Sequence, residues 1–404
     1  MKSILRVFVL LMTSVMVFTG CSDDDKVKTY DYSIRVNVPE EVKDADLSGL
    51  SVTITNVNSM EKQTVTTDNK GSVPFTVREG VYTMEVTGEL EYHFQESEGG
   101  EITQKVQMAG IKENVTLSES QTAETISIDL YIQAENKGWV IKEIYFSGTR
   151  TTSGGAYSKD QFIEIYNNTD KVMYADGLSI GNTYQTSAAM PNIYLDDLNN
   201  NTFLYAVYTV PGNGTQYPVE PGKSIVIACQ PIDHTENNSI NLAPPAADFQ
   251  WYDPLAGYID VPEVPNLNKY YSASKTVWIF QTQGNKGMIV FKVDDMGMTD
   301  FIEKHKDIRK NNANNDVTSI KVPNKYILDA VEFAQQDKFN TKTLSPSLDI
   351  GFMYTESTYN GKSVRRKVKS VDNGRIIYQD TNNSTVDFLP NRTPGPKQHF
   401  SDEK

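Results

Sequence analysis

Apolar and polar residues alternate with a period of two over much of residues 30–134, a pattern typical of β-strands with one buried face. The alternating apolar positions are Tyr32, Ile34, Val36 and Val38, then Leu50, Val52 and Ile54, then Tyr82, Met84 and Val86, and finally Ile126, Ile128, Leu130 and Ile132. Between two further strand-like runs, Asp68-Asn69-Lys70-Gly71 favours a turn, because glycine takes positive φ without steric cost. We therefore predict a first β-domain, residues 30–134, with a hairpin over residues 64–75.

Residues 138–397 carry similar strand patterns and form the second predicted domain. Apolar runs at residues 139–146, 162–167 and 224–229 are typical of strands, and the last of them favours a buried one. The predicted fold class is all-β, with two β-sandwich domains and at least one short helix.

The predicted helix begins at Asp300, which forms a capping-box pattern with Glu303 three residues later. Phe301, Ile302 and Ile308 fall near one helical face, so we expect the helix to continue until Asn311.

Residues 1–20 have the pattern of an export signal. Lys2 and Arg6 form a cationic start, and the apolar run at residues 7–18 is too short to span a bilayer. We expect cleavage before Cys21, so that the mature chain begins there.

The residues around Cys21 resemble a lipobox, which implies a thioether between its thiol and diacylglycerol and a membrane anchor. The alternative is an ordinary secretory peptide whose first mature residue is cysteine. The segment Ser22, Asp23, Asp24, Asp25 resembles the acidic export signal of bacteroidete-type lipoproteins, which implies an outer-membrane protein facing the exterior. Alternatively, residues 21–29 are only a solvated, acidic tether.

Composition narrows the classes of partner. The 404 residues include 38 Lys and Arg against 52 Asp and Glu, a formal charge of −14, which disfavours binding to phosphate backbones, so we expect no nucleic-acid partner. A lipidated Cys21 cannot pair with Cys229, the other of the 2 cysteines, so no disulfide is expected. Cys229 is predicted to be a small core residue. We expect no cofactor and no zinc site; calcium held by Asp and Asn oxygens is the alternative.

Within the first domain, the order of Asp68, Gly71, Gly80 and Tyr82 resembles transthyretin-like, carboxypeptidase-regulatory-like sandwiches. That resemblance implies a non-catalytic spacer or docking unit.

The second domain resembles lamin-tail domains. The matching blocks are Glu143, residues 164–167, 176–178, 221–227, 327–333 and 363–366, and residues 392–396. The resemblance implies an immunoglobulin-like sandwich, here interrupted by insertions near residues 184–216 and 231–324. The whole chain resembles an uncharacterised family of bacteroidete lipoproteins that join these two modules.

Candidate chemistry is sparse. Residues 177–181 match Gly-x-Ser-x-Gly, but no helix pattern follows, as a hydrolase elbow would need, so we predict a strand instead. Aromatic residues gather in the larger insertion, and Trp251, Tyr252, Tyr258, Tyr270 and Tyr271 are candidates for holding a glycan or small ligand by stacking. The alternative is a satellite hydrophobic core under a long loop.

These observations favour a non-enzymatic surface lipoprotein that acts as a binding or docking protein. It either captures an extracellular ligand or assists an outer-membrane β-barrel transporter. Two alternatives stay open: a secreted hydrolase with its site in the insertions, and a structural or adhesion component of the envelope.

Overall fold

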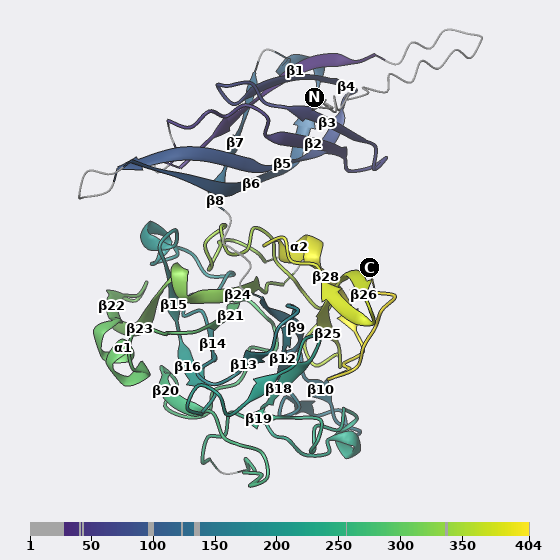
Figure 1. Ribbon diagram of the computed structural model, residues 1–404. Coiled ribbons are helices and arrows are strands. Elements are labelled where there is room, and N and C mark those ends of the chain that lie inside the picture. Colours follow the sequence, from purple (N-terminus) through teal and green to yellow (C-terminus); the bar gives the residue numbers. More distant parts are fainter. Residues whose placement is uncertain are drawn as a thin grey trace, which may run out of the picture.

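The structure is a computed structural model, and it describes residues 28–39, 42, 44–95, 101–122, 124–132, 138–255, 257–335 and 338–403. These residues form two β-rich bodies, which we call the first body (residues 28–132) and the second body (residues 138–403) (Figure 1). Among the described residues there are two α-helices, and both are short. The predicted all-β fold class is therefore confirmed. Over the same ranges, no helix has the length and hydropathy that crossing a membrane requires.

Two sheets of the first body enclose one hydrophobic core. One sheet has the order β4-β1-β7, with β1 (Tyr30–Asn37), β4 (Ser72–Val77) and β7 (Thr125–Asp129). The other has the order β3-β2-β5-β6-β8, with β2 (Ser51–Asn56), β3 (Lys62–Thr66), β5 (Gly80–Gln95), β6 (Glu101–Leu117) and β8 (Tyr131–Ile132). A 3₁₀ turn, η2 (Glu119–Gln121), precedes β7. The predicted alternation explains the packing, because Tyr32, Ile34 and Val36 of β1 are buried whereas their neighbours are more exposed.

The turn at Asp68 is present, but it does not close a hairpin. Asp68 Oδ1 accepts the backbone N–H of Lys70 at 2.9 Å and that of Ser72 at 2.8 Å. Gly71 has φ +72°, and a Cβ there would lie 2.5 Å from Val36 Cγ2. However, β3 pairs with β2 and β4 pairs with β1. The predicted hairpin is wrong because the turn chemistry specifies only a chain reversal, and here the reversal passes from one sheet to the other.

The second body is built around two larger sheets. The first has the order β19-β18-β12-β9-β25-β28, with β9 (Trp139–Tyr145), β12 (Phe162–Asn167), β18 (Ser224–Ala228), β19 (Phe249–Gln250), β25 (Ser363–Arg366) and β28 (Phe388–Arg392). The second has the order β20-β16-β14-β21-β24, with β14 (Ser179–Asn182), β16 (Ala206–Thr209), β20 (Asn268–Ser272), β21 (Gly287–Phe291) and β24 (Ile327–Glu332). The main hydrophobic core lies between them, because both sheets contribute its apolar side chains.

Smaller elements complete the second body. A third sheet has the order β15-β23-β22, with β15 (Asn201–Leu204), β22 (Lys306–Lys310) and β23 (Asp316–Pro323). Three further pairs of short strands are present among the described residues. They are β10 (Thr149–Arg150) with β11 (Ala156–Tyr157), β13 (Met173–Tyr174) with β17 (Pro218–Val219), and β26 (Val368–Asp372) with β27 (Arg375–Tyr378). The helical elements are η3 (Leu195–Asp197), η4 (Thr235–Asn237), α1 (Met298–Lys304), η5 (Asn324–Tyr326) and α2 (Ser384–Asp387).

The segments expected as insertions are integral to this fold. Residues 184–216 and 231–324 contain β16, β20 and β21, which are three of the five strands in the β20-β16-β14-β21-β24 sheet. These segments therefore contribute strands to the sheet that covers one side of the main core.

The predicted helix is shorter than expected. It spans α1, its N-cap is Gly297, and Asp300 lies in its first turn. Phe301 and Ile302 are buried, as predicted, but Ile308 belongs to β22 and is 66% exposed. The extension to Asn311 is wrong because residues 306–310 pair with β23, and this strand pairing replaces further helical turns.

A single carboxylate organises the loop between β16 and β17. Asp176 accepts four backbone hydrogen bonds, from the N–H groups of Asn213, Gly214, Gln216 and Tyr217 at 2.8–3.0 Å. Partial burial acts to raise the pKa of Asp176, but these bonds outweigh it and hold the pKa below its ordinary value. Asp176 thereby fixes a loop that has few apolar contacts of its own.

Replacing Asp176 with asparagine is expected to lower the free energy of unfolding by about 2 kcal/mol at pH 7, because charge-assisted hydrogen bonds are lost. A carboxylate with a lowered pKa stabilises the fold above its unfolded pKa and stops doing so as the pH falls through the folded value. The difference between variant and wild type should therefore shrink below pH 4. Urea unfolding from pH 3 to 7 measures it, with the exposed Asp170→Asn as control; a difference independent of pH would contradict the account.

Candidate functional site

The sequence-predicted anchor and export residues, Cys21 and Ser22, Asp23, Asp24 and Asp25, lie outside the described residues. The aromatic candidates are described, and they do not form one cluster. Trp251 is 1% exposed in the main core and donates its indole Nε1–H to the carbonyl of Trp278 at 3.1 Å. Because neither ring face is open, burial favours the core interpretation for Trp251.

The four tyrosine candidates are half-buried and lie in different places. Tyr258 packs against the main core. Tyr270 and Tyr271 pack against a separate hydrophobic cluster, whose buried residues include Leu204, Phe291, Phe301 and Ile320. Tyr271 donates its hydroxyl to the carbonyl of Thr318 at 2.6 Å, which ties it to β23. Tyr252 follows Trp251 in the chain and is also half-buried. Ligand binding by these rings stays a prediction.

Two candidate nucleophiles are buried. Ser179 opens β14, and its Oγ lies 2.8 Å from Thr209 Oγ1 on the neighbouring strand, so the Gly-x-Ser-x-Gly stretch is a strand as predicted. Cys229 is buried in the main core, also as predicted. Burial raises the pKa of the Cys229 thiol, which keeps it protonated.

Ion pairs lie beneath the C-terminal segment, residues 393–403. Lys142 Nζ lies 2.8 Å from Glu164 Oε1, Arg365 Nη2 lies 3.1 Å from Glu143 Oε1, and these side chains are almost fully buried. Backbone groups of the segment complete the network, since Lys142 donates to the Gln398 carbonyl and Arg365 to that of Thr393. These charges hold the C-terminal segment against β9, β12 and β25 and are not open to a ligand.

A second buried network centres on Arg366. Its guanidinium contacts three carboxylates: Asp329 at 2.5 Å, Asp380 at 3.0 Å and Asp387 at 3.8 Å. Burial raises the pKa of Asp329 to about 7, although the Arg366 charge opposes the shift. One cation therefore contacts three acids in this network.

Next to this network lies a third, around Asp349. Asp349 accepts the backbone N–H of Glu332 at 2.7 Å and that of Ser384 at 2.8 Å, and Lys342 Nζ lies 2.5 Å from Glu332 Oε2. Burial raises the pKa of Asp349 to about 6. The Lys342 ammonium group thus acts on two acids, Glu332 and Asp349.

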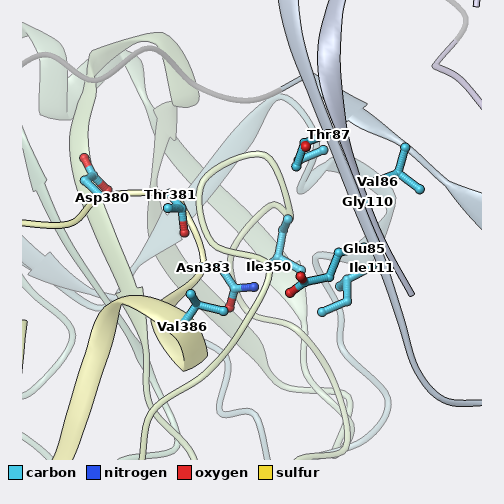
Figure 2. Close-up of a pocket in the computed structure, with 11 residues that line it drawn as sticks. Glu85, Val86, Thr87, Gly110, Ile111, Ile350, Asp380, Thr381, Asn383 and Val386 are labelled. Atoms are coloured by element: carbon cyan, nitrogen blue, oxygen red, sulfur yellow. The ribbon is translucent and has the colours of Figure 1, made fainter. Parts of the chain in front are cut away.

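A hollow of about 360 Å³, which we call the interbody cleft, lies between the two bodies beside these networks (Figure 2). The first body lines it with Glu85, Val86, Thr87, Ala109, Gly110 and Ile111, and the second body with Ile350, Asp380, Thr381, Asn383 and Val386. Both walls are therefore needed to form it.

Strand pairing positions the first wall. Glu85 lies opposite Ile111 and Thr87 opposite Ala109 in the β5-β6 pair. Because side chains alternate along a strand, these residues share the face opposite the buried Val86. Figure 2 shows the Glu85 carboxylate pointing from this face across the cleft.

Asp387 positions the second wall. It accepts the backbone N–H and the hydroxyl of Thr381, both at 2.8 Å, and the backbone N–H of Asn383 at 3.3 Å. The Asn383 side chain is 8% exposed, and its Oδ1 is buried without a hydrogen-bond partner. This oxygen lies against Gly351, whereas the amide nitrogen of Asn383 points toward Glu85 in Figure 2.

A second hollow of about 500 Å³ is lined by Gly138, Asn168, Thr169, Lys369, Ile377, Tyr378 and Asp380. It shares Asp380 with the interbody cleft. We take the cleft as the candidate site because residues of both bodies line it and the Glu85 carboxylate points across it.

Sequence reasoning missed this site. Glu85 and Asn383 lie near opposite ends of the chain, and no motif surrounds either of them. Glu85 occupies a polar position of the regular β5 alternation, between the buried Met84 and Val86, and solvent exposure alone explains a polar residue there. Within the described residues, no group of three or more His, Cys, Asp or Glu side chains could hold a metal ion.

The chain is similar to a family of unknown function and to a solved structure from that family. A family model described as protein of unknown function (DUF4876) matches residues 220–395, within the second body. A crystal structure of a DUF4876 family protein from Bacteroides thetaiotaomicron is 26% identical, with a TM-score of 0.59, and the match covers 93% of this chain and 98% of that one. No curated protein matches the chain.

Two further solved structures are more distant. A putative adhesin from Bacteroides ovatus is 10% identical with a TM-score of 0.21, covering 76% of this chain and 92% of that one. The major pilin subunit of Bacillus cereus is 9% identical with a TM-score of 0.17, and the match covers 73% of this chain and 95% of that one. Both scores are too low to indicate a shared fold. The family model and the Bacteroides thetaiotaomicron structure together support the expected relationship to an uncharacterised family of Bacteroidetes type.

Proposed function

We propose that this chain is a lipid-anchored protein of the outer membrane that faces the exterior and holds a ligand or partner in the interbody cleft without transforming it. In this proposal, Cys21 carries the lipid and Ser22 to Asp25 direct export. The first body is a transthyretin-like spacer, and the second is a lamin-tail-like recognition domain.

The observation that carries the proposal is the convergence of both bodies on the cleft. The Glu85 carboxylate and the amide nitrogen of Asn383 point toward each other across it (Figure 2). Ligand sites form preferentially at interfaces between domains, where a few polar groups converge among apolar ones. The cleft has this composition.

The hydrolase alternative has less support. In the described residues, Ser179 is hydrogen-bonded inside a sheet. The acids with raised pKa values all accept hydrogen bonds from buried neighbours; they are Glu143, Asp160, Asp329 and Asp349. A general acid or base needs access to substrate.

The proposal also includes calcium binding and assistance to an outer-membrane β-barrel transporter. Calorimetric titration tests the first, and co-purification from the native membrane tests the second.

Replacing Cys21 with serine is expected to move the protein from the membrane to the soluble fraction, because the thioether cannot form. Fractionation of native cells with detection by antibody measures this. Protease treatment of intact cells bearing the wild type tests its orientation, and digestion is expected. A Cys21→Ser protein that still sediments with membranes would contradict the anchor.

A tryptophan at Thr87 is expected to block the cleft while leaving the fold intact, since Thr87 is exposed on the outer face of β5. A ligand at one hundred times its Kd stabilises its target by about 2.7 kcal/mol. Thermal unfolding with a panel of lysine derivatives, polyamines and neutral oligosaccharides should show at least one ligand that stabilises the wild type but not Thr87→Trp. Thr76→Trp, an exposed site on β4, is the control. If every stabilising ligand protects both variants equally, the cleft is not the site.

A further inference from the structure

We infer that one end of the first body is a membrane-contact surface, at which Val57 and Met60 enter the bilayer that holds the lipid anchor. The inference rests on the anchor in the proposed function and adds a second contact, made by the protein itself. The partner at this surface is a lipid bilayer, and the contact fixes which end of the first body faces it.

The turn between β2 and β3 lies at the same end of the first body as the start of β1. Tyr30, the first residue of β1, lies opposite Val77, the last residue of β4. β5 begins shortly afterwards at Gly80, and the backbone N–H of Val57 donates to the carbonyl of Val81 at 2.9 Å. The turn over residues 57–60 therefore lies at the end from which the chain leads back to Cys21, and we call this the tether end.

The tether end exposes apolar side chains. Met60 is 65% exposed and Val57 is 41% exposed. Among the residues of the first body whose exposure is described, these are the two large apolar side chains that lie open to solvent. Tyr30, Val77 and Val81 are half-buried beside them. The exposed apolar surface of the first body is thus confined to this end, over the residues described.

The turn presents Met60 on an ordered backbone. Asn56 Oδ1 accepts the backbone N–H groups of Asn58 and Ser59, both at 2.9 Å, and the Asn56 carbonyl accepts that of Met60 at 2.9 Å. Met60 has φ +60°, and most of the other described non-glycine residues with positive φ are asparagine. Glycine or asparagine would adopt this conformation at lower cost, so an exposed methionine here supports a role for its side chain.

A lipid on Cys21 would hold the tether end close to the bilayer. Cys21 precedes Lys28 by seven positions, and a chain of that length reaches about 25 Å at most. Anchoring raises the effective concentration of a second, weak contact. Two apolar side chains that would bind a bilayer poorly on a free protein can therefore stay in contact with it on an anchored one.

The polar residues of the tether end suit a membrane interface. Lys28 Nζ lies 4.7 Å from the centroid of the Tyr30 ring and 2.9 Å from Glu119 Oε1. Tyrosine is enriched at membrane–water interfaces, and lysine keeps its charged head in water above an apolar stem. Because charged side chains of both signs lie at this end, the contact should not depend on anionic lipids. The others are Glu61, Lys62, Arg78 and Glu79.

Quenching of an introduced tryptophan by brominated lipid tests the inference on the mature chain. The Cys21 thiol is coupled to a maleimide lipid in phosphatidylcholine vesicles, which supplies an anchor without the cell, and the buried Cys229 does not compete. Met60→Trp places an indole on the turn, whereas Lys70→Trp places one at an exposed position beside the other end of β1, roughly 20 Å away along the strand. Brominated acyl chains should quench the first indole and not the second. The native tryptophans are buried in the second body, so the wild type gives the background.

Two results would overturn the inference: equal quenching of the two indoles, or no quenching of the one at position 60. Val57→Trp, on the same turn, should also be quenched, and it keeps the test valid if circular dichroism shows that Met60→Trp does not fold. An indole at position 60 that is shielded from aqueous acrylamide in native membranes, but not quenched on vesicles, would assign the turn to a protein partner instead.

The chemical anchor separates this test from that of the proposed function. If Cys21→Ser leaves the membrane in cells but the coupled chain shows no quenching at position 60, the inference fails while the proposed anchor stands. If quenching occurs but Cys21→Ser still sediments with membranes, the proposed anchor fails while the contact surface stands.

Discussion

Replacing Arg366 with methionine is expected to lower the free energy of unfolding by about 3–5 kcal/mol at pH 7.5. The guanidinium is 1% exposed and contacts Asp329, Asp380 and Asp387, so its removal takes away the cation that these three carboxylates share. Breaking a buried ion pair from one side is strongly destabilising, because the remaining charge stays desolvated. Urea or guanidinium unfolding measures the loss.

Acidic pH should reduce this loss. Burial already raises the pKa of Asp329, and without the opposing charge of Arg366 this carboxyl group gains a proton more easily and no longer carries a buried charge. Lys310→Met is the matched control, because Lys310 pairs with Asp316 on the surface and such pairs contribute about 1 kcal/mol or less. Equal losses for the two variants would show that the Arg366 network is not buried as described.

Replacing Trp251 with alanine is expected to cost about 3–5 kcal/mol, because a large aromatic side chain is removed from a packed core. Its ring lies 4.8 Å from that of Phe280 and 5.5 Å from that of Trp278, measured between centroids. The indole also donates the hydrogen bond to the Trp278 carbonyl. Thermal and chemical unfolding measure the cost.

This substitution also separates the two interpretations of the aromatic segment. A residue kept for ligand binding could be replaced with little loss of stability, whereas a core residue could not. Tyr252→Ala is the control, since Tyr252 is adjacent and half-buried, and its loss should be clearly smaller. A cost for Trp251→Ala below about 1 kcal/mol would contradict its place in the core.

Local patterns predicted local structure well. The alternation that buries Tyr32, Ile34 and Val36 places β1 correctly, and the strand expected at Ser179 is present. What failed were predictions that depend on distant partners. Residues 64–75 have the turn chemistry of a hairpin, yet the strands on either side pair in different sheets. Ile308 fits the apolar face of a helix, but it lies in β22 because residues 306–310 pair with β23.

The candidate site depends even more on distant contacts. Glu85 has the sequence context of an exposed strand residue, and Asn383 that of a loop residue in a polar stretch. Their relation exists only because β5 of one body faces the 380–386 segment of the other. Hydrophobic periodicity shows which side of a strand is buried within its own domain, but it carries no information on which other domain covers the outer side.

A ligand held in the interbody cleft would contact both bodies at once. Methyl NMR of the mature chain, labelled at the δ1 methyl groups of isoleucine, tests it most directly, because Ile111 and Ile350 lie on opposite walls of the cleft. Titration with a ligand that stabilises the wild type in the thermal-unfolding panel should shift both signals along saturating curves with a single Kd, and Thr87→Trp should abolish both shifts. Saturating shifts at only one of the two isoleucines, or at neither while methyl groups elsewhere respond, would contradict a shared site between the bodies.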